Sequence, residues 1–279
     1  MTISGKAKLA GVMGWPIGHS RSPRLHGHWL ERYGIDGAYV PLAVAPERAE
    51  QAIRALPALG FRGCNVTVPL KEIAFRTVDR LDDTARRMGA VNTIVVHDDG
   101  TLEGGNTDGF GFVESLKADR PDWCAERGPA VVVGAGGAAR AVVVALLDAG
   151  APEVRLINRT DARAEELATD IGGPITVAPW VSRETALEGA ALLVNTTTQG
   201  MTGQPPLDLD LRALPVAAVV NDIVYVPLDT PLLAAARRRG NPVVTGIGML
   251  LHQARPGFAA WFGVEPEVTA DLARFVLEG

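Results

Sequence analysis

In the second half of this chain, short apolar and β-branched runs alternate with longer segments of helical periodicity. Strands are expected at residues 130–133, 154–158, 191–195, 218–221 and 242–245, and helices at 138–149, 161–171 and 230–239. Thr230 and Pro231 open the last helix as an N-cap and a first-turn proline. Such alternation is typical of βαβ units, so this half is predicted to be an α/β domain with a mostly parallel sheet.

The first hundred residues repeat the alternation with weaker signals. Strands are expected at residues 9–13, 38–44 and 63–68, and a helix at 23–33, where Leu25, Trp29 and Tyr33 are spaced by four. A glycine-rich segment, residues 104–109, separates this half from the next. A domain boundary near residue 108 follows, and the chain is predicted to form two α/β domains.

Composition narrows the class of protein. The chain has 279 residues, enough for two domains, and a net charge of −5, which gives no support for a nucleic-acid partner. Two cysteines, Cys64 and Cys124, cannot form a disulfide framework or a cysteine metal cluster, and no metal ligand set is predicted. Neither a signal-peptide pattern nor a run of about 20 apolar residues is present, so a cytoplasmic protein without a membrane partner is expected.

The segment Gly134-Ala135-Gly136-Gly137-Ala138-Ala139 follows a predicted strand and opens a predicted helix. It fits the pattern G-x-G-x-x-A, in which the first glycine permits a tight turn and the second lets the backbone approach a pyrophosphate. The free N–H groups at the start of the helix then favour phosphate. This context predicts a dinucleotide site, although glycine turns also occur for purely structural reasons.

The next strand ends in Asn158-Arg159-Thr160, with Arg163 one helical turn later. A site that prefers NAD usually places Asp or Glu at this strand end, where it binds the ribose hydroxyls. A neutral residue followed by arginine suits a 2′-phosphate, because guanidinium forms charge-assisted hydrogen bonds with it. NADP is therefore the expected cofactor, and the alternative is a solvated arginine pair without function.

Polar residues gather in turns of the N-terminal half. Ser22 is well placed as a helix N-cap, whereas Ser20 has no such structural role and is a candidate ligand-binding hydroxyl. Asn65 and Thr67 would share one face of a strand, and Lys71 follows just beyond its end, where open α/β sheets bind ligands.

A lone lysine is usually a solvated surface residue, so Lys71 needs a partner to be a catalytic candidate. Asp108, among glycines that suggest a close backbone approach, is that candidate partner. Asn92 is a further polar candidate, for which an Asx-type turn is the alternative.

Taken together and in order, these motifs resemble the shikimate dehydrogenase family over nearly the whole chain. The matching segments are Gly18-His19-Ser20-Arg21-Ser22-Pro23, residues 65–71, Gly89-Ala90-Val91-Asn92-Thr93, Asn106-Thr107-Asp108-Gly109, the glycine loop, Asn158-Arg159-Thr160, and Thr245-Gly246-Ile247-Gly248-Met249 with Gln253. The chain departs from the usual pattern at Gly27 and in residues 195–201.

The resemblance implies reversible reduction of 3-dehydroshikimate to shikimate with NADPH, in aromatic amino-acid biosynthesis. It implies a substrate-binding domain of residues 1–107 and 247–279, to which the last helices return, interrupted by a Rossmann-like NADP domain of residues 108–246. Lys71 and Asp108 would be the catalytic pair. Ser20, Ser22, Thr67, Asn92, Tyr225 and Gln253 would bind substrate, and Gly134, Ala135, Gly136, Gly137, Ala138, Asn158, Arg159, Thr160, Arg163, Gly246 and Met249 would bind cofactor.

Three alternatives stay open at this point. One is a quinate/shikimate dehydrogenase that uses NAD, and another is a non-catalytic NADP-binding regulator of the same fold. A methylene-tetrahydrofolate dehydrogenase would share the split two-domain plan, although Ser20, Ser22 and Gln253 suit a small polyol acid better. Oligomeric state is left as monomer or homodimer.

Overall fold

The computed structural model describes residues 3–278, and the chain divides into two compact units. One consists of Met1–Thr107 with Leu251–Gly279 and is called the split unit here, and the other, Asp108–Leu250, is called the central unit. The first division coincides with the expected boundary near residue 108. The second falls at Leu251, a little beyond the expected return at residue 247, because α9 (Ile247–Phe262) is one helix that runs across it.

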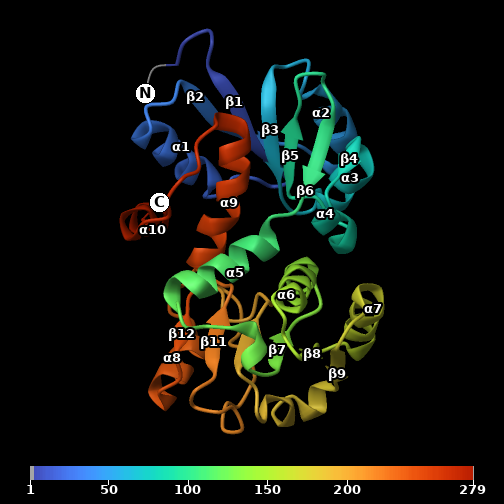
Figure 1. Cartoon of the computed structure of the whole chain (residues 1–279), viewed down its shortest axis with the longest axis vertical. Coiled ribbons are helices and arrows are strands. Elements are labelled where there is room, and N and C mark those ends of the chain that lie inside the picture. The colour runs from blue at the N-terminus through green and yellow to red at the C-terminus, as the bar shows by residue number, and fades with distance from the viewer. Residues whose placement is uncertain (1–2, 279) are drawn as a thin grey trace. The chain divides into compact units, whose positions relative to one another are not determined.

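The split unit is built on a six-stranded mixed sheet in the order β2-β1-β3-β5-β6-β4 (Figure 1). β1 runs parallel to β2 and β3, whereas β5 pairs antiparallel with β3 and β6. The strand bounds are β1 Lys8–Gly14, β2 Gly37–Ala43, β3 Phe61–Val66, β4 Arg80–Leu81, β5 Thr93–Val96 and β6 Leu102–Gly105. Its helices are α1 Ser22–Arg32, α2 Ala49–Ala55, α3 Lys71–Thr77, α4 Asp83–Met88 and α10 Ala270–Leu277, together with most of α9.

The glycine-rich segment is not a linker, because Gly104 and Gly105 are the last residues of β6. A Cβ on Gly104 would lie 2.7 Å from Val91, and one on Gly105 would lie 2.5 Å from the Asp82 carboxylate. The glycines are therefore needed for close packing inside the split unit. The expected strand at residues 63–68 also ends early, since β3 stops at Val66.

Trp261 of α9 attaches the returning chain to the sheet of the split unit. Its indole Nε1 donates a 3.0 Å hydrogen bond to the carbonyl of Ile94 in β5. A Cβ on Gly63 of β3 would lie 2.0 Å from that Nε1, so only glycine leaves room for the indole. The resemblance implied that the last helices return to the first domain. The Trp261 contact attaches α9 to the sheet formed by the first 107 residues.

The central unit has an all-parallel sheet in the order β12-β11-β10-β7-β8-β9. Its strands are β7 Ala130–Val133, β8 Val154–Ile157, β9 Ile175–Ala178, β10 Leu192–Asn195, β11 Val219–Asp222 and β12 Val243–Val244. Its helices are α5 Asp108–Asp119, α6 Gly137–Asp148, α7 Asp161–Ile171 and α8 Pro231–Arg239. This is a doubly wound, Rossmann-like order. Strands β8 and β9 are added on one side of β7, and β10, β11 and β12 are added on its other side, so the switch point lies between β7 and β10.

Both faces of this parallel sheet are buried, as β7 shows residue by residue. Ala130 and Val132 belong to one core cluster and Val131 and Val133 to another, because side chains alternate across a strand. The first cluster includes residues of α5, α6 and α7, and the second includes residues of α8. Strands buried on both faces give continuous apolar runs, which explains why the sequence located them well.

The expected α8 features are confirmed. Thr230 caps the helix through its side chain, which accepts a hydrogen bond from the N–H of Leu233, and the run Arg237-Arg238-Arg239 lies in the last turn.

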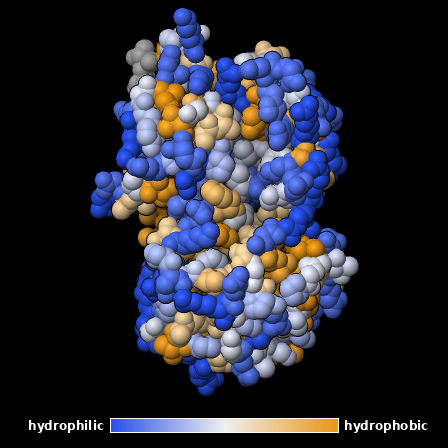
Figure 2. Space-filling view, viewed as in Figure 1, coloured by the Kyte–Doolittle hydropathy of each residue, from blue (hydrophilic) through white to orange (hydrophobic). Residues whose placement is uncertain are grey.

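One face of the surface is shown in Figure 2, where hydrophilic residues predominate and exposed apolar residues are scattered. Over residues 3–278, no helix has the length and hydropathy required to cross a membrane.

Candidate active site and nucleotide site

A buried polar cluster lies where β3 ends in the split unit. The Tyr39 hydroxyl donates a 2.6 Å hydrogen bond to the Asn65 side-chain oxygen, and it also hydrogen-bonds the Ser22 side chain. The Asn65 amide donates to the hydroxyl of Thr93 and to the carbonyl of Asn92. Burial raises the pKa of Tyr39 well above its ordinary value, so its hydroxyl stays protonated and available as a donor.

Thr107 continues this cluster toward the C-terminal helices. Its backbone N–H donates a 2.9 Å hydrogen bond to the Asn92 side-chain oxygen, and its hydroxyl donates to the carbonyl of Gln253 at 2.8 Å. Asn92 is 3% exposed, and its amide donates back to the Thr107 hydroxyl. Asn92 therefore does not form a local Asx turn, as the alternative for it supposed, but joins two distant segments.

Neither serine caps the helix that follows them. The helix α1 begins one residue early, with Arg21 as N-cap, and Ser22 makes no capping hydrogen bond. Instead, the Ser20 hydroxyl accepts a 3.3 Å hydrogen bond from the N–H of Ser22. The expectation that Ser22 caps the helix is wrong, because the helix starts at Ser22 itself and turns its side chain inward toward Tyr39.

Thr67 and Lys71 follow β3 in the loop that leads into α3. Thr67 lies just outside the strand, not within it, although its N–H still donates to the carbonyl of Met13 at 2.9 Å. Its methyl group fills the space that a Cβ on Gly14 would need. Lys71 is the first residue of α3, and its carbonyl accepts from the N–H of Val91, next to Asn92. The N–H of Val66, next to Thr67, also donates to the carbonyl of Asn92, so backbone bonds hold this loop beside the Asn92 segment.

Asp108 follows Thr107 directly and is the first residue of α5. A carboxylate there is stabilised by the positive end of the helix dipole. Its placement is therefore set by the Thr107 hydrogen bonds on one side and by the helix start on the other.

His26 is the most unusual side chain near this cluster. It is fully buried, stacks on Tyr39 with ring centroids 3.9 Å apart, and neither ring nitrogen has a partner among the described residues. Burial lowers its pKa from 6.5 to about 3, so the ring is neutral. His26 supports the Tyr39 ring by stacking and is not placed to transfer protons.

In the central unit, the glycine loop has the conformation expected of a phosphate-binding turn. Gly134 has a φ of +119°, and a Cβ there would lie 2.5 Å from the hydroxyl of Thr196. Gly136 is the N-cap of α6 and Gly137 its first residue, and a Cβ on either would meet open space. Ala135 and Ala138 are half-buried beside them, and Ala139 packs in the core. The exposed glycine backbone at a helix start fits a dinucleotide pyrophosphate.

The second cofactor segment lies at the end of the neighbouring strand. Asn158 follows β8, and its side chain donates to the carbonyl of Thr160, which shapes the turn into α7. Arg159 and Arg163 are exposed and form no ion pair within residues 3–278. Two exposed guanidinium groups at this edge fit a 2′-phosphate.

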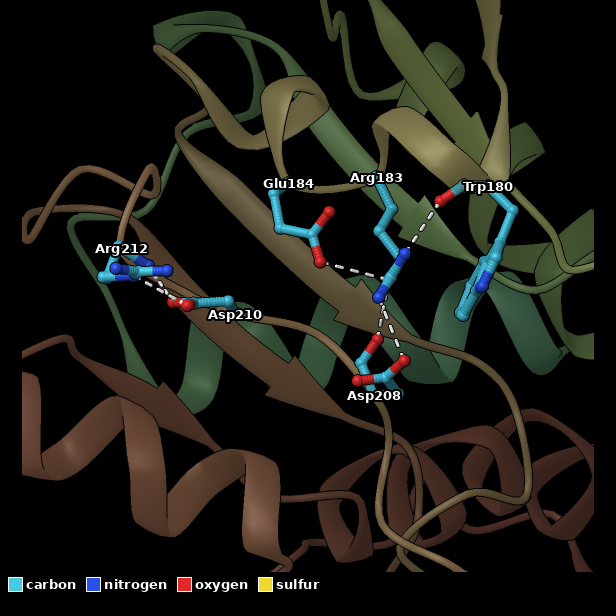
Figure 3. Close-up of polar contacts among 6 residues, drawn as sticks. All are labelled: Trp180, Arg183, Glu184, Asp208, Asp210 and Arg212. Carbon is cyan, nitrogen blue, oxygen red and sulfur yellow. Dashed lines mark hydrogen bonds and ion pairs between the residues drawn. The ribbon is translucent and has the colours of Figure 1, made fainter.

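A cluster of charged residues holds the segment that follows β9 (Figure 3). Arg183 hydrogen-bonds the carbonyl of Trp180 and the Asp208 carboxylate, pairs with Glu184, and places its guanidinium 4.9 Å from the centre of the Trp180 ring. The N–H of Trp180 in turn donates to Asp161, the first residue of α7. The cluster therefore supports the turn that carries Arg159 and Thr160.

A second buried network lies at the ends of β10 and β11. Asp222 accepts hydrogen bonds from the Asn195 amide at 3.0 Å, the Val224 N–H at 3.1 Å and the Thr230 hydroxyl at 2.7 Å. Burial raises the pKa of Asp222 to about 6, while these donors oppose the rise. Tyr225 lies half-buried in the loop that leaves Asp222.

Gly246 and Met249 have packing roles in addition to those that the resemblance implied. A Cβ on Gly246 would lie 2.3 Å from the carbonyl oxygen of Ile223, so the two backbones pack directly against each other. Met249 packs against the core cluster that contains α5 and α6.

No individual role in the site was predicted from the sequence for Tyr39, Thr93, Thr107, Asn195 or Asp222. Each lies at or near a strand end, and each is linked through side-chain hydrogen bonds to a residue that the sequence did single out or to a loop next to one. The available signal was a polar residue at the end of an apolar strand, as in Asn195 and Asp222.

Comparisons with known proteins agree with this architecture. The family model described as Shikimate dehydrogenase substrate binding domain matches residues 12–94, and the one described as Shikimate / quinate 5-dehydrogenase matches residues 122–201. The chain is 67% identical over 275 residues to the shikimate dehydrogenase (NADP(+)) of Paramagnetospirillum magneticum, covering 99% of this chain and 100% of that protein.

Solved structures give the same result. Shikimate 5-dehydrogenase from Thermus thermophilus, in complex with NADP(H) and shikimate, is similar with a TM-score of 0.84 at 37% identity, covering 97% of each chain. Quinate dehydrogenase from Corynebacterium glutamicum, in complex with NAD, is similar with a TM-score of 0.90 at 30% identity, covering 98% of this chain and 99% of that one. On identity and coverage, this chain belongs to the shikimate dehydrogenase family.

Proposed function

We propose that this chain catalyses the reversible NADPH-dependent reduction of 3-dehydroshikimate to shikimate, a step of aromatic amino-acid biosynthesis. The observation that carries the proposal is the cluster of hydroxyl and amide groups around Asn65, Asn92 and Thr107, next to Lys71 in the split unit. Neutral donors and acceptors of this kind suit a polyhydroxylated ring. The named relative at 67% identity supports the same reaction.

The substrate is held by Ser20, Ser22, Thr67, Asn92, Tyr225 and Gln253 in this proposal. The Asn92 side-chain oxygen accepts from Thr107 and Thr93, which fixes the orientation of the amide group. Ser22 has no capping duty, which leaves its hydroxyl to face Tyr39 and substrate. Hydrogen bonds to several hydroxyls orient the ring, and a site built for them rejects analogues that lack them.

Lys71 donates the proton that the ketone oxygen takes up on reduction, with Asp108 as the second member of the pair. When bound, NADPH supplies the hydride. In the reverse direction Lys71 accepts the hydroxyl proton.

Cofactor binding is assigned to Gly134, Ala135, Gly136, Gly137, Ala138, Asn158, Arg159, Thr160, Arg163, Gly246 and Met249. The open glycine backbone at the start of α6 fits the pyrophosphate, and the two exposed arginines fit the 2′-phosphate. Residues 1–107 and 247–279 form the substrate domain in this proposal, and residues 108–246 form the NADP domain. A cytoplasmic location, a monomer or homodimer, and the absence of a nucleic-acid partner are parts of the same proposal.

The test is steady-state reduction of NADP with shikimate, run beside NAD and beside quinate. Turnover with NADP and shikimate, and little with the other pairs, is the expected result. Comparable rates with NAD or quinate would instead indicate the broader quinate/shikimate class. Binding of NADPH without turnover on any pair would indicate a regulator and overturn the proposal.

Replacing Lys71 separates catalysis from binding. Lys71→Ala is expected to lower kcat by at least about a hundredfold while the affinity for shikimate changes far less, because general acid catalysis acts in the transition state. Glu72→Ala, at the next and more exposed position, is the matched control and should keep kcat within about twofold. A Lys71→Ala enzyme within about threefold of the wild-type kcat would contradict the assigned role.

A further inference from the structure

Asp222 is a buried carboxylate that the proposed reaction does not use directly. It is the last residue of β11 and has no exposed surface. Burying a charge without partners is strongly unfavourable, so such a group is kept only where donors surround it. Here one carboxylate oxygen accepts from the Asn195 amide and the Val224 N–H, and the other accepts from the Thr230 hydroxyl.

The Asn195 side chain extends this network into the loop after β10. Asn195 is paired with Asp222 in the sheet, and its amide also donates to the carbonyl of Gln199. Its oxygen accepts from both the N–H and the hydroxyl of Thr197, and that hydroxyl accepts from the N–H of Gln199. Residues 196–200 are thus wound around Asn195, whose orientation is fixed by Asp222.

The loop after β11 is held from the same carboxylate. Val224 binds it through its N–H, and Thr230, which binds it through its hydroxyl, caps α8. Between these two points lies Tyr225. The two loops are also joined by a 3.0 Å hydrogen bond from the N–H of Thr202 to the carbonyl of Val226. The backbone of Gly246 packs against Ile223 at the base of the second loop.

We propose that Asp222 is a positioning residue for hydride transfer, which fixes the loops of residues 196–204 and 223–229 so that Tyr225 and Gly246 are correctly placed. This inference rests on the proposed function, because those two residues are the ones assigned to substrate and cofactor. Asp222 acts through the loops and touches neither ligand. The Asn195 amide and the Val224 N–H can only donate, and the Thr230 hydroxyl directs its proton to Asp222 while its oxygen accepts from the N–H of Leu233, so a carboxylate satisfies all three partners.

The adenine half of the dinucleotide offers an internal reference. Arg159 lies at the end of β8, and in the sheet β7 separates β8 from β10. Binding of 2′,5′-ADP, which lacks the nicotinamide half, therefore reports whether the central unit is folded without reporting on the two loops.

A matched control lies at the amino ends of strands in the same sheet, away from the two loops. Asn241 is 4% exposed and donates to the carbonyls of Pro215, Val216 and Ala218 before β11 and β12.

The experiment compares Asp222→Asn, Thr230→Val, Thr230→Ser and Asn241→Ala with the wild-type chain. Amide hydrogen exchange of residues 196–204 and 223–229, 2′,5′-ADP affinity by calorimetry, thermal unfolding, and kcat per 2′,5′-ADP site are measured for each. For Asp222→Asn we expect exchange in both loops to be at least about tenfold faster, 2′,5′-ADP affinity to stay within about threefold, and kcat to fall at least about tenfold. Asn241→Ala should lower Tm yet keep the exchange of both loops and kcat per site within about twofold.

Thr230→Val removes one of the three donors and provides the result if Asp222→Asn does not fold. It should speed loop exchange and lower kcat per site in the same direction, and Thr230→Ser, which keeps the hydroxyl, should restore both. Unchanged loop exchange and unchanged kcat per site in Asp222→Asn, or in Thr230→Val if only that variant folds, would overturn the inference. Failure of the wild-type chain to turn over shikimate would overturn the proposed function instead, and the exchange result would still show whether Asp222 holds the loops.

Discussion

The two units solve the same structural problem with different chemistry. Each has a polar network at the carboxyl ends of its central strands, where α/β sheets bind ligands. In the split unit the network of Tyr39, Asn65 and Thr107 consists of neutral groups, with the neutral ring of His26 stacked on it. In the central unit the corresponding network is organised by the carboxylate of Asp222.

This difference gives the two units opposite responses to acid. A buried histidine with a lowered pKa resists protonation in the folded state, whereas a buried aspartate with a raised pKa takes up a proton more readily when folded than when unfolded. Acid therefore destabilises the split unit through His26 and stabilises the central unit through Asp222. The stability of a network that is neutral when folded still depends on pH if one of its groups, such as His26, takes up a proton in the unfolded chain.

Removing the hydroxyl of Thr107 is expected to have the largest effect on this comparison. Thr107→Val leaves the Gln253 carbonyl and the Asn92 amide without that partner, and should lower the free energy of unfolding by roughly 2–4 kcal/mol. Thr107→Ser keeps the hydroxyl and should recover most of the loss. Urea unfolding of the three proteins measures it. A Thr107→Val chain as stable as the wild type, beside a destabilised Thr107→Ser chain, would show that the methyl group, not the hydrogen bonds, matters.

Replacing His26 should remove the acid sensitivity of the split unit. Its pKa is lowered from 6.5 to about 3, so stability from the neutral ring is present above pH 6.5 and is lost as pH falls. Between pH 7.5 and 5.0 the wild-type chain should lose about 2 kcal/mol more than His26→Phe. His28→Phe, at a less buried position of the same helix, is the control. A His26→Phe chain with the same pH dependence as wild type would show that the ring is protonated when folded.

Replacing Asp222 should reveal the opposite sign in the central unit. Its folded pKa of about 6 exceeds the ordinary value of 3.8, so this group contributes stability that grows as pH falls through that window. From pH 7.5 to 5.0 the wild-type chain should gain about 1.5 kcal/mol relative to Asp222→Asn. Unfolding at matched pH values measures the difference, and a relative loss in acid would contradict the burial argument.

The smallest effect is expected at the edge of the central unit. Arg183→Met removes the contacts with Asp208, Glu184 and the Trp180 ring, most of them at the surface, and should lower stability by about 1 kcal/mol. Because Trp180 braces the turn behind Arg159, the affinity for 2′,5′-ADP should fall by about twofold to fivefold. Arg212→Met, an exposed arginine paired with Asp210 (Figure 3), is the control and should leave that affinity unchanged.

The sequence predicted the central unit better than the split unit for a physical reason. β7 is buried on both faces and reads as a continuous apolar run, as does β10 up to its last residue, and α7 was located at its observed bounds. In the split unit, β4 has only two residues, and β6 ends in two glycines, which the sequence presents as a loop. Those glycines are required by packing against Val91 and Asp82, and no local pattern records that requirement.

The candidate residues were found only where a local motif marked them. The glycine loop and Arg159 stand in a recognisable strand–turn–helix context. Thr107 and Asp222 act through partners far away in sequence, such as Gln253 for Thr107, and neither is unusual on its own. The capping role expected of Ser22 was wrong because a shift of one residue in the helix start makes Arg21 the N-cap.

The attachment of Trp261 to the sheet also has a consequence for synthesis of the chain on the ribosome. The central unit is continuous in sequence, so all of its residues are synthesised before Trp261. The split unit lacks Trp261, and with it the indole that fills the space above Gly63 and binds Ile94, until the whole central unit has been translated. The half that is translated first is therefore the half that finishes folding last.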